Sequence, residues 1–312
     1  MNPAIEIQNL RKTYAGGKKT PPKEALKGID LTIPCGSFFG LLGPNGAGKS
    51  TIINIMAGLV VKTSGEVRIC GHDIEKDMRQ ARLSIGVVPQ ELVLDTFFTV
   101  REALDFHAGY YGVPAGKRRT QEIIERMGLS DKADIHPRRL SGGMRRRMLV
   151  AKALVHTPPV LILDEPTAGV DVELRTQLWD YVRELNKAGT TILLTTHYLE
   201  EAQELCDTIA VINHGEVITC QPKNNLLKMF DSKQLVITPI VPITAIPASL
   251  HTFTSEIDSE NRLVISYKPS ENTIQDILDA VHASGVAISD MTTREADLED
   301  IFLHLTSKKV AA

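Results

Sequence analysis

The stretch Gly43-Pro44-Asn45-Gly46-Ala47-Gly48-Lys49-Ser50 has the pattern G-x-x-x-x-G-K-S of a phosphate-binding loop. An apolar run precedes it at residues 38–42, and residues 51–56 continue it as a helix. In this strand–loop–helix context the glycines let the backbone turn its N–H groups onto an anion, and the helix N-terminus adds positive potential. We therefore predict a nucleoside triphosphate site over these residues and Thr51. Lys49 is expected to reach the β- and γ-phosphates, and the Ser50 hydroxyl is expected to ligate Mg²⁺.

A second chemical motif lies at residues 161–166, where an apolar run ends in Asp164 and Glu165. A carboxylate at the tip of a strand can hold the shell of a magnesium ion, and we assign that role to Asp164. Glu165 is placed to polarise a water for attack on the γ-phosphate, so it is the expected general base. Two adjacent acids after a strand are often only a solvated turn. The phosphate-binding loop upstream is what favours the catalytic interpretation.

Strand-like and helix-like segments alternate along the first 222 residues. Continuous apolar runs, such as residues 85–88, 160–163 and 191–195, are typical of strands buried on both faces of a mostly parallel sheet. Apolar residues at helical spacing, from Leu174 to Leu185, predict a helix that stops near Gly189. This alternation indicates an α/β domain with helices packed on a sheet.

Residues 140–143 read Leu-Ser-Gly-Gly, about 100 residues after the phosphate-binding loop and about 20 residues before the two acids. In this order and spacing, the three motifs resemble those of the nucleotide-binding subunit of an ATP-binding cassette (ABC) ATPase. The resemblance covers residues 1–222. It implies an α/β P-loop NTPase of ABC type, with a mixed sheet core and a helical signature subdomain, that binds and hydrolyses ATP with Mg²⁺.

The resemblance also assigns roles to residues that would be unremarked alone. Tyr14 matches the aromatic residue that stacks on adenine, and Gln90 matches the Q-loop glutamine, which contacts Mg²⁺ or the water and senses the transport subunit. His197 matches the switch histidine at the γ-phosphate, and Asp171 matches the D-loop acid. In the family an open helix N-terminus caps the γ-phosphate of an ATP held by the other subunit, and its residues here are Ser141, Gly142 and Gly143.

These matches complete the expected site. The expected catalytic residues are Glu165, His197, Gln90 and Lys49, and the expected Mg²⁺ ligands are Ser50, Gln90 and Asp164.

Departures from the commonest family pattern indicate one branch. Met144 stands where the signature usually has glutamine, and the D-loop reads Ala-Gly-Val-Asp at residues 168–171. Both variants resemble the multidrug- and polysaccharide-export (type 2) branch, as do the basic residues 145–147 and the Leu-Glu-Asp-Ile-Phe segment at residues 298–302. The basic triplet is equally consistent with a solvated helix face that balances nearby acids.

A change of pattern near residue 222 predicts a small second domain over residues 223–312. We expect a linker helix at about 223–231, followed by an α+β domain in the order β-β-α-β-α. The expected strands are residues 235–238, 263–267 and 286–288. A helix should open at Thr273, because Asp276 three residues on completes a capping-box pattern. An amphipathic helix with Leu298, Ile301, Phe302 and Leu305 ends the domain.

Composition narrows the function classes. With 35 Lys and Arg against 38 Asp and Glu, the net charge of −3 argues against a bulk electrostatic grip on nucleic acid or anionic lipid. The four cysteines are scattered without a C-x-x-C pair, which argues against a zinc site or a disulfide framework. No apolar run approaches a transmembrane helix, and the first eleven residues lack a secretory apolar region, so we expect a cytoplasmic protein.

One chain carries one phosphate-binding loop and one signature segment, whereas each catalytic site of the family combines the two from different subunits. The expected function is therefore that of the energy-coupling subunit of an ABC exporter. It would work as a head-to-tail ATP-sandwich dimer on the cytoplasmic face of the cell membrane, with a separately encoded transmembrane permease. The alternative is a soluble ABC-type ATPase that acts on nucleic acid or the ribosome. A long coiled coil or a second cassette would favour it, and the sequence has neither.

Overall fold

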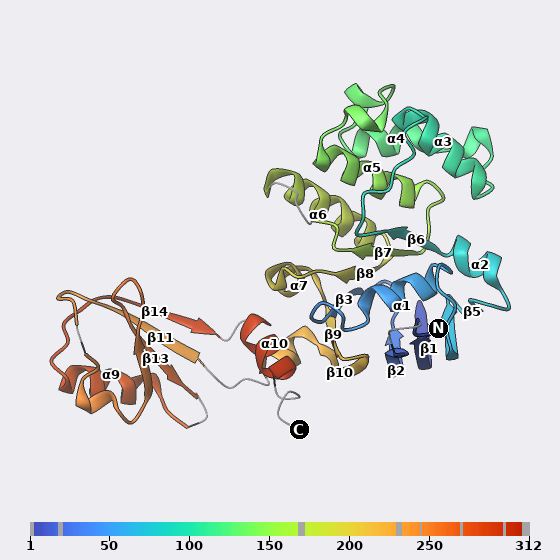
Figure 1. Cartoon of the computed structure of the whole chain (residues 1–312). Helices are drawn as coiled ribbons and strands as arrows, with labels where there is room; N and C mark the ends of the chain where they lie inside the picture. Colours follow the sequence, from blue (N-terminus) through green and yellow to red (C-terminus); the bar gives the residue numbers. More distant parts are fainter. Residues whose placement is uncertain are drawn as a thin grey trace. The chain divides into compact units, whose positions relative to one another are not determined.

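The computed structural model describes residues 3–17, 21–167, 172–228, 233–243, 245–268, 271–295 and 298–307. The chain divides into two compact units, Met1–Lys223 and Asn224–Ala312, each treated separately below (Figure 1). Among the described helices, none has the length and apolar character that crossing a bilayer requires.

A six-stranded sheet forms the centre of the first unit, in the order β10-β9-β3-β8-β7-β6. Its strands are β3 (Phe38–Leu42), β6 (Ile85–Val88), β7 (Val160–Asp164), β8 (Thr191–Thr195), β9 (Thr208–Asn213) and β10 (Glu216–Pro222). All pairs are parallel except β9 with β10, so the sheet is mixed. Every residue of β3, β7 and β8 is buried, which confirms what their unbroken apolar runs predicted.

A second sheet, antiparallel and ordered β2-β1-β4-β5, packs over the same core. Its strands are β1 (Ile5–Tyr14), β2 (Lys23–Ile33), β4 (Ser64–Ile69) and β5 (His72–Asp73). Helix α1 (Lys49–Met56) contributes Ile52, Ile53 and Ile55 to the cluster that both sheets share. A continuous apolar core therefore packs against the phosphate-binding loop and the helix that follows it.

Helices inserted between β6 and β7 form the expected helical subdomain. They are α3 (Val100–Tyr110), α4 (Thr120–Arg126) and α5 (Gly142–Leu154), with 3₁₀ turns at Ala115–Lys117, Ser130–Lys132 and Pro137–Arg139. A short helix, α2 (Met78–Leu83), lies between β5 and β6. Figure 1 shows α3, α4 and α5 grouped beyond the β6 and β7 edge of the sheet. Two further helices, α6 (Val172–Lys187) and α7 (Leu199–Leu205), flank β8 in the sequence.

The C-terminal unit is an antiparallel sheet with one helix on its apolar face. Its elements are α8 (Lys223–Lys228), β11 (Lys233–Pro239), a 3₁₀ turn (Ala248–Leu250), β12 (Thr254–Ile257), β13 (Leu263–Tyr267), α9 (Ile274–Ala283), β14 (Ile288–Glu295) and α10 (Leu298–Ser307). The sheet order is β12-β13-β11-β14, and Ile277 and Val281 of α9 pack on Leu235 and Leu263.

The predicted strand order of this unit was wrong by one strand. The sequence analysis omitted β12, because Thr-Ser-Glu-Ile has one apolar residue and lies at the sheet edge, half exposed. The helix predicted to open at Thr273 is present, with both hydrogen bonds of its capping box. Residues 229–231 of the expected linker helix lie outside the described residues.

Candidate functional site

The phosphate-binding loop connects β3 to α1, and packing requires two of its glycines, Gly43 and Gly48. A Cβ on Gly43 would lie 2.3 Å from the carbonyl oxygen of Ile212 in β9. Gly48, the residue before α1, has φ of +114°, and its Cβ would lie 2.7 Å from Leu26 in β2. Backbone bonds from Ala47 N to Pro44 O and from Gly215 N to Ala47 O hold the loop closed. No larger residue fits at either glycine without moving backbone or core.

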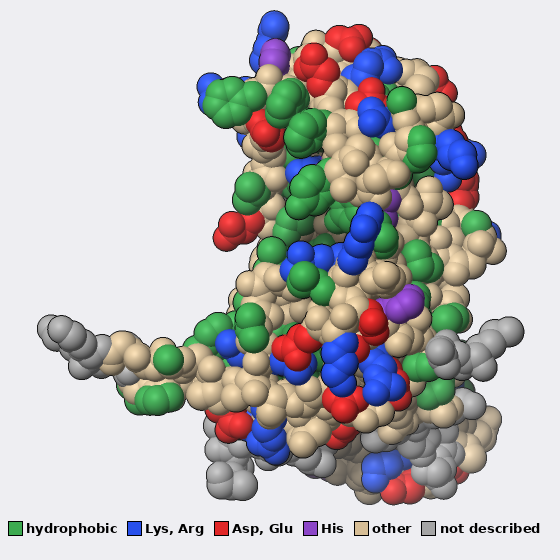
Figure 2. All heavy atoms as spheres, turned by 90° about the vertical axis from the view of Figure 1, so that its right-hand side faces the viewer, with side chains coloured by type: hydrophobic (Ala, Val, Ile, Leu, Met, Phe, Trp, Pro, Cys, Tyr) green, Lys and Arg blue, Asp and Glu red, His purple; other side chains and the backbone are tan. Residues whose placement is uncertain are grey.

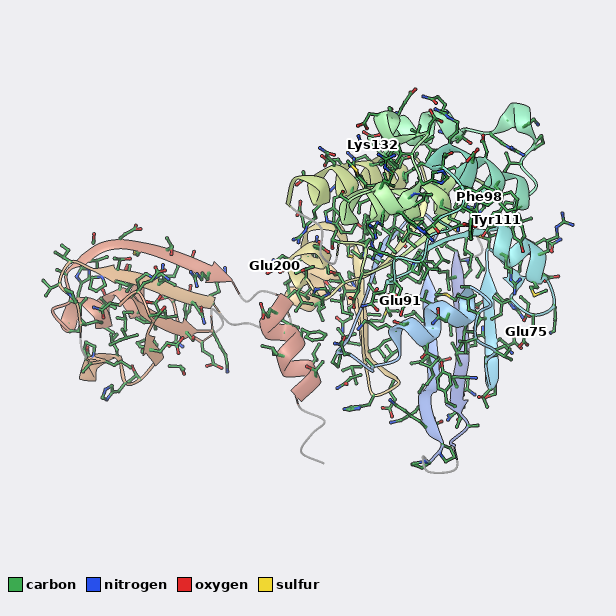
Figure 3. The ribbon with its side chains drawn as sticks, turned by 45° about the horizontal axis from the view of Figure 1, so that its top comes forward. Glu75, Glu91, Phe98, Tyr111, Lys132 and Glu200 are labelled. Carbon is green, nitrogen blue, oxygen red and sulfur yellow. The ribbon has the colours of Figure 1, made fainter. Side chains whose placement is uncertain are left out.

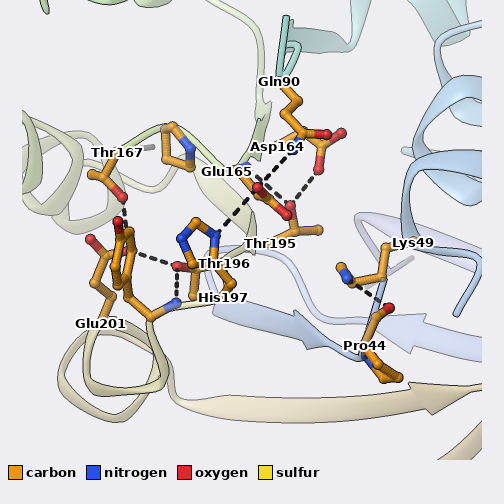
Figure 4. A network of polar contacts seen from close by, with 12 residues as sticks. Pro44, Lys49, Gln90, Asp164, Glu165, Thr167, Thr195, Thr196, His197 and Glu201 are labelled. Carbon is orange, nitrogen blue, oxygen red and sulfur yellow. Dashed lines mark hydrogen bonds and ion pairs between the residues drawn. The ribbon is translucent and has the colours of Figure 1, made fainter. Parts of the chain in front are cut away.

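Lys49 is the one charged residue of this loop, and its side chain turns inward. It is only 7% exposed, and its Nζ donates to the carbonyl oxygens of Gly43 at 2.6 Å and Pro44 at 3.3 Å (Figure 4). Burial lowers the pKa of Lys49, and the charges of Glu165 and Asp164 oppose that shift. The Lys49 ammonium group therefore lies close enough to Glu165 and Asp164 to interact with the charge of each carboxylate.

Asp164 ends β7, and its carboxyl group is buried beside hydroxyl groups. The Thr195 hydroxyl donates to Asp164 Oδ1 at 2.5 Å. Burial raises the pKa of Asp164, while hydrogen bonds from Thr195 and Ser50 and the charge of Lys49 oppose the shift. The Ser50 hydroxyl and the Asp164 carboxylate thus adjoin each other. Hard oxygen donors of this kind suit Mg²⁺, so these two predicted ligands fit that ion.

Glu165 follows directly and has the left-handed backbone conformation, with φ of +48°. Its N–H donates to the carbonyl oxygen and the hydroxyl of Thr195, at 3.0 and 3.1 Å. Its Oε2 accepts from Gln90 Nε2 at 2.8 Å and lies 3.3 Å from His197 Nδ1 (Figure 4). The structure therefore brings the three predicted residues Gln90, Glu165 and His197 together at one carboxylate oxygen. A non-glycine residue at positive φ is rare and indicates a position that the surrounding structure enforces.

A cavity of about 310 Å³ connects these residues to the phosphate-binding loop. Its wall includes residues 45–51, Gln90, Glu165 and Tyr14, together with Lys23 and Ala25, which the sequence analysis did not single out. The Tyr14 hydroxyl lies 3.5 Å from Thr51 Oγ1, and Lys12 Nζ lies 4.8 Å from the centre of the Tyr14 ring. A cavity lined by both a glycine-rich anion cradle and an aromatic ring fits a nucleotide.

The signature residues do not line this cavity. Ser141 is the N-cap of α5, and its hydroxyl accepts from Met144 N at 3.3 Å. Ser141 and Gly142 are exposed, and a Cβ on Gly142 would meet nothing within 4 Å. The start of α5 is therefore exposed and separate from the wall of this cavity. Asp171 lies outside the described residues.

Two polar groups of the site were missed from the sequence. Arg146 does not lie on a solvated helix face: it is 3% exposed and donates to main-chain carbonyls. Glu201 is 6% exposed, and its Oε2 accepts from Thr167 Oγ1 at 3.1 Å and Thr196 Oγ1 at 2.8 Å. Thr195 and Thr196 directly precede His197 in the sequence. This position beside a predicted site residue was the available signal that both threonines belong to the site.

The chain is similar to known proteins over almost its whole length. The family model described as "ABC transporter" matches residues 26–168. The linearmycin resistance ATP-binding protein LnrL of Bacillus subtilis is 36% identical, and the match covers 97% of this chain and 98% of that protein. This chain belongs to the ABC transporter family. The membership confirms the predicted family and the ATPase class.

Other proteins that are similar to this ABC protein are also ATP-binding proteins or cassettes. The Nod factor export ATP-binding protein I of Ralstonia nicotianae is 35% identical over 99% of this chain and 95% of its own length. The solved dimeric cassette MJ0796, in a post-hydrolysis state bound to ADP and Pi, is 29% identical with a TM-score of 0.65, and the match covers 70% of this chain and 98% of that one. The cassette fold predicted for the first unit is thereby confirmed.

Proposed function

We propose that this ABC protein hydrolyses ATP to energise an exporter whose membrane path is a separate permease. The observation that carries the proposal is the convergence of Gln90 and His197 on Glu165 Oε2, at the wall of the phosphate-binding cavity. A carboxylate held by an amide donor and an imidazole can accept a proton from an attacking water. Asp164 and Ser50 would hold Mg²⁺, which supplies charge neutralisation at the phosphates.

The active form proposed is a head-to-tail dimer with two ATP molecules between the subunits. The exposed N-terminus of α5 supports this dimer. Its open N–H groups suit an anion, but they do not line the cavity of their own chain, so the anion would be bound by a second copy. In this arrangement each site takes Lys49 and Glu165 from one copy and Ser141 to Gly143 from the other. Asp171 is proposed to lie at the same dimer contact.

A groove on the first unit supports docking of a membrane partner beside the Q-loop. A depression of about 590 Å³ lies between α1, α3 and α5, with Pro89 and Val93 on its wall. Large apolar side chains around it are exposed, including Val93 at 68% and Tyr110 at 82%. Figure 2 shows hydrophobic side chains gathered on one face of the molecule around a hollow. Aromatic residues before and after α3 in the chain border the same region, for example Phe98 and Tyr111 (Figure 3).

An exposed apolar surface of this extent is typical of a site for a protein partner. We therefore place the chain on the cytoplasmic face of the membrane, held there by the permease. The export direction rests on the names of its relatives, among them a Nod factor export ATP-binding protein and two drug-resistance proteins.

Replacing the base tests the proposal. We expect Glu165→Gln to bind ATP normally but to lose hydrolysis by at least about 100-fold, because removing a general base costs roughly 10²- to 10⁴-fold. Steady-state phosphate release measures the rate, and gel filtration with ATP should show a trapped dimer. Glu200→Gln is the matched control, since Glu200 is an exposed acid on α7. Wild-type hydrolysis by Glu165→Gln would contradict the base assignment.

The partner is identified by capture. Tagged Glu165→Gln is incubated with detergent-solubilised membranes of the native host, with and without MgATP, and bound proteins are identified by mass spectrometry. One polytopic membrane protein is the expected result. Recovery of ribosomal or DNA-associated proteins in its place would overturn the exporter and favour the soluble ATPase alternative.

A further inference from the structure

Arg146, in the second turn of the signature helix α5, is the most heavily bonded buried side chain near the site. It is 3% exposed, and its guanidinium donates to carbonyl oxygens of two separate segments. Those distances are 2.7 Å to Pro89, 2.9 Å to Gln90, 3.0 Å to Asp164 and 2.7 Å to Pro166, and a further bond reaches the carbonyl of Glu165.

The geometry of this contact suits arginine alone. A guanidinium carries five N–H donors in a rigid plane, whereas a lysine ammonium is a single point with three. Only the planar group can reach the Q-loop and the turn after β7 at the same time. Within the described ranges its partners are carbonyl oxygens, and no carboxylate forms an ion pair with it. Burying such a charge is costly unless every donor is satisfied.

Both segments that Arg146 holds carry reacting groups. Gln90 follows β6, and Glu165 follows β7 in the left-handed conformation that turns successive carbonyl groups toward one point. The side chains of these two residues also meet each other, at 2.8 Å from Gln90 Nε2 to Glu165 Oε2. Because α5 begins at the signature residues, its position is tied to that of the base through one side chain.

We propose that Arg146 is a positioning residue that clamps the signature helix to the backbone of the Q-loop and of the general base. The inference rests on the proposed ATP-hydrolysing dimer and deepens it. Within one chain, Arg146 links the base of one composite site to the signature segment that serves the other. It does not line the phosphate-binding cavity, so its effect is on the placement of Glu165 and Gln90 and on the orientation of α5.

The test uses the full chain with Arg146→Lys, and with Arg145→Lys as the matched control. Arg145 is the preceding residue of α5, and its Nε donates to Leu140 O in its own segment. ATP affinity is measured by calorimetry and kcat is expressed per bound ATP, so that loss of folded protein does not imitate loss of catalysis. We expect Arg146→Lys to keep its ATP affinity within about twofold and to lose kcat by about 10- to 100-fold, because small misplacements of reacting groups cost that much. Arg145→Lys should stay within about twofold of wild type in both.

A second measurement probes the link to α5. In the Glu165→Gln background, Arg146→Lys should weaken the ATP-dependent dimer by about tenfold or more in sedimentation experiments, and Arg145→Lys should not. Arg146→Met, which leaves the carbonyls without donors, should be more impaired than Arg146→Lys, so that lysine gives partial rescue. Equal kcat per site for the two lysine variants, or a parallel loss of ATP binding and kcat in Arg146→Lys, would overturn the inference. A wild-type chain that neither hydrolyses ATP nor dimerises with it would instead refute the proposed function.

Discussion

Asp164 is a buried carboxyl group, and the ionised form that would hold Mg²⁺ lowers the stability of the folded protein. Burial raises its pKa, so the folded protein binds this proton more tightly than the unfolded chain does. The ionised carboxylate therefore lowers the free energy of unfolding, and stability falls as pH rises through the range between the unfolded and folded pKa values. Asp164→Asn removes that cost and keeps an oxygen that accepts from Thr195. We expect it to raise the thermal midpoint of the nucleotide-free protein at neutral pH by about 2–4 °C, which corresponds to about 1 kcal/mol.

Calorimetric melts at several pH values check this prediction. The gain should be present at pH 7.5 and should shrink as the pH falls below the folded pKa, where wild-type Asp164 is itself protonated. Mg²⁺-dependent nucleotide binding should weaken in the same variant. Asp134→Asn is the control, because Asp134 is 78% exposed in its contact with Arg101. A lower midpoint for Asp164→Asn at neutral pH would show that the carboxylate is a net stabiliser.

At the scale of elements, Glu201 of α7 joins three segments around the switch histidine. Its carboxylate accepts from Thr167 after β7 and from Thr196 after β8 (Figure 4). Nε of Arg175 in α6 lies 3.5 Å from the other carboxylate oxygen. The ring of Tyr198 packs against the Arg175 guanidinium at 4.6 Å. One buried carboxylate therefore links the connections that leave β7 and β8.

Removing that carboxylate should loosen these connections. We expect Glu201→Ala to lower the free energy of unfolding by about 1–3 kcal/mol, because it leaves two buried hydroxyl groups without an acceptor. Urea unfolding followed by fluorescence measures the change. The neighbouring Glu200→Ala should be neutral within about 0.5 kcal/mol, since Glu200 is exposed. Similar free energies of unfolding for the two alanine variants would show that the Glu201 carboxylate does not stabilise these connections.

At the scale of the whole molecule, the proposed head-to-tail dimer would make each chain half of two sites. Lys49→Ala removes the P-loop half and Ser141→Arg removes the signature half, so neither variant should hydrolyse ATP alone. A one-to-one mixture should recover about a quarter of wild-type activity, because half of the dimers are mixed and each mixed dimer holds one complete site. Phosphate release as a function of mixing ratio measures it. A mixture as inactive as its components would mean that no composite site forms.

The sequence by itself determined the parts whose chemistry is local. The glycine-rich loop, the two acids after β7 and the unbroken apolar strands each depend on neighbours in the chain, so their pattern survives in one dimension. Tyr14, Gln90 and His197 were assigned only by the resemblance to the ABC family, and the structure places all three near the phosphate-binding loop or Glu165.

Only the tertiary structure decided which polar side chains are buried and what they hold. Arg146 and Glu201 each sit in a run of charged residues that resembles a solvated helix face. The carbonyl partners of Arg146 lie 18 or more residues away, and a backbone carbonyl has no letter in a sequence. Glu201 accepts from the nearby Thr196 and from Thr167, which is 34 residues away. Strand β12 escaped detection for a related reason, because pairing with β13 stabilises it more than its own composition does.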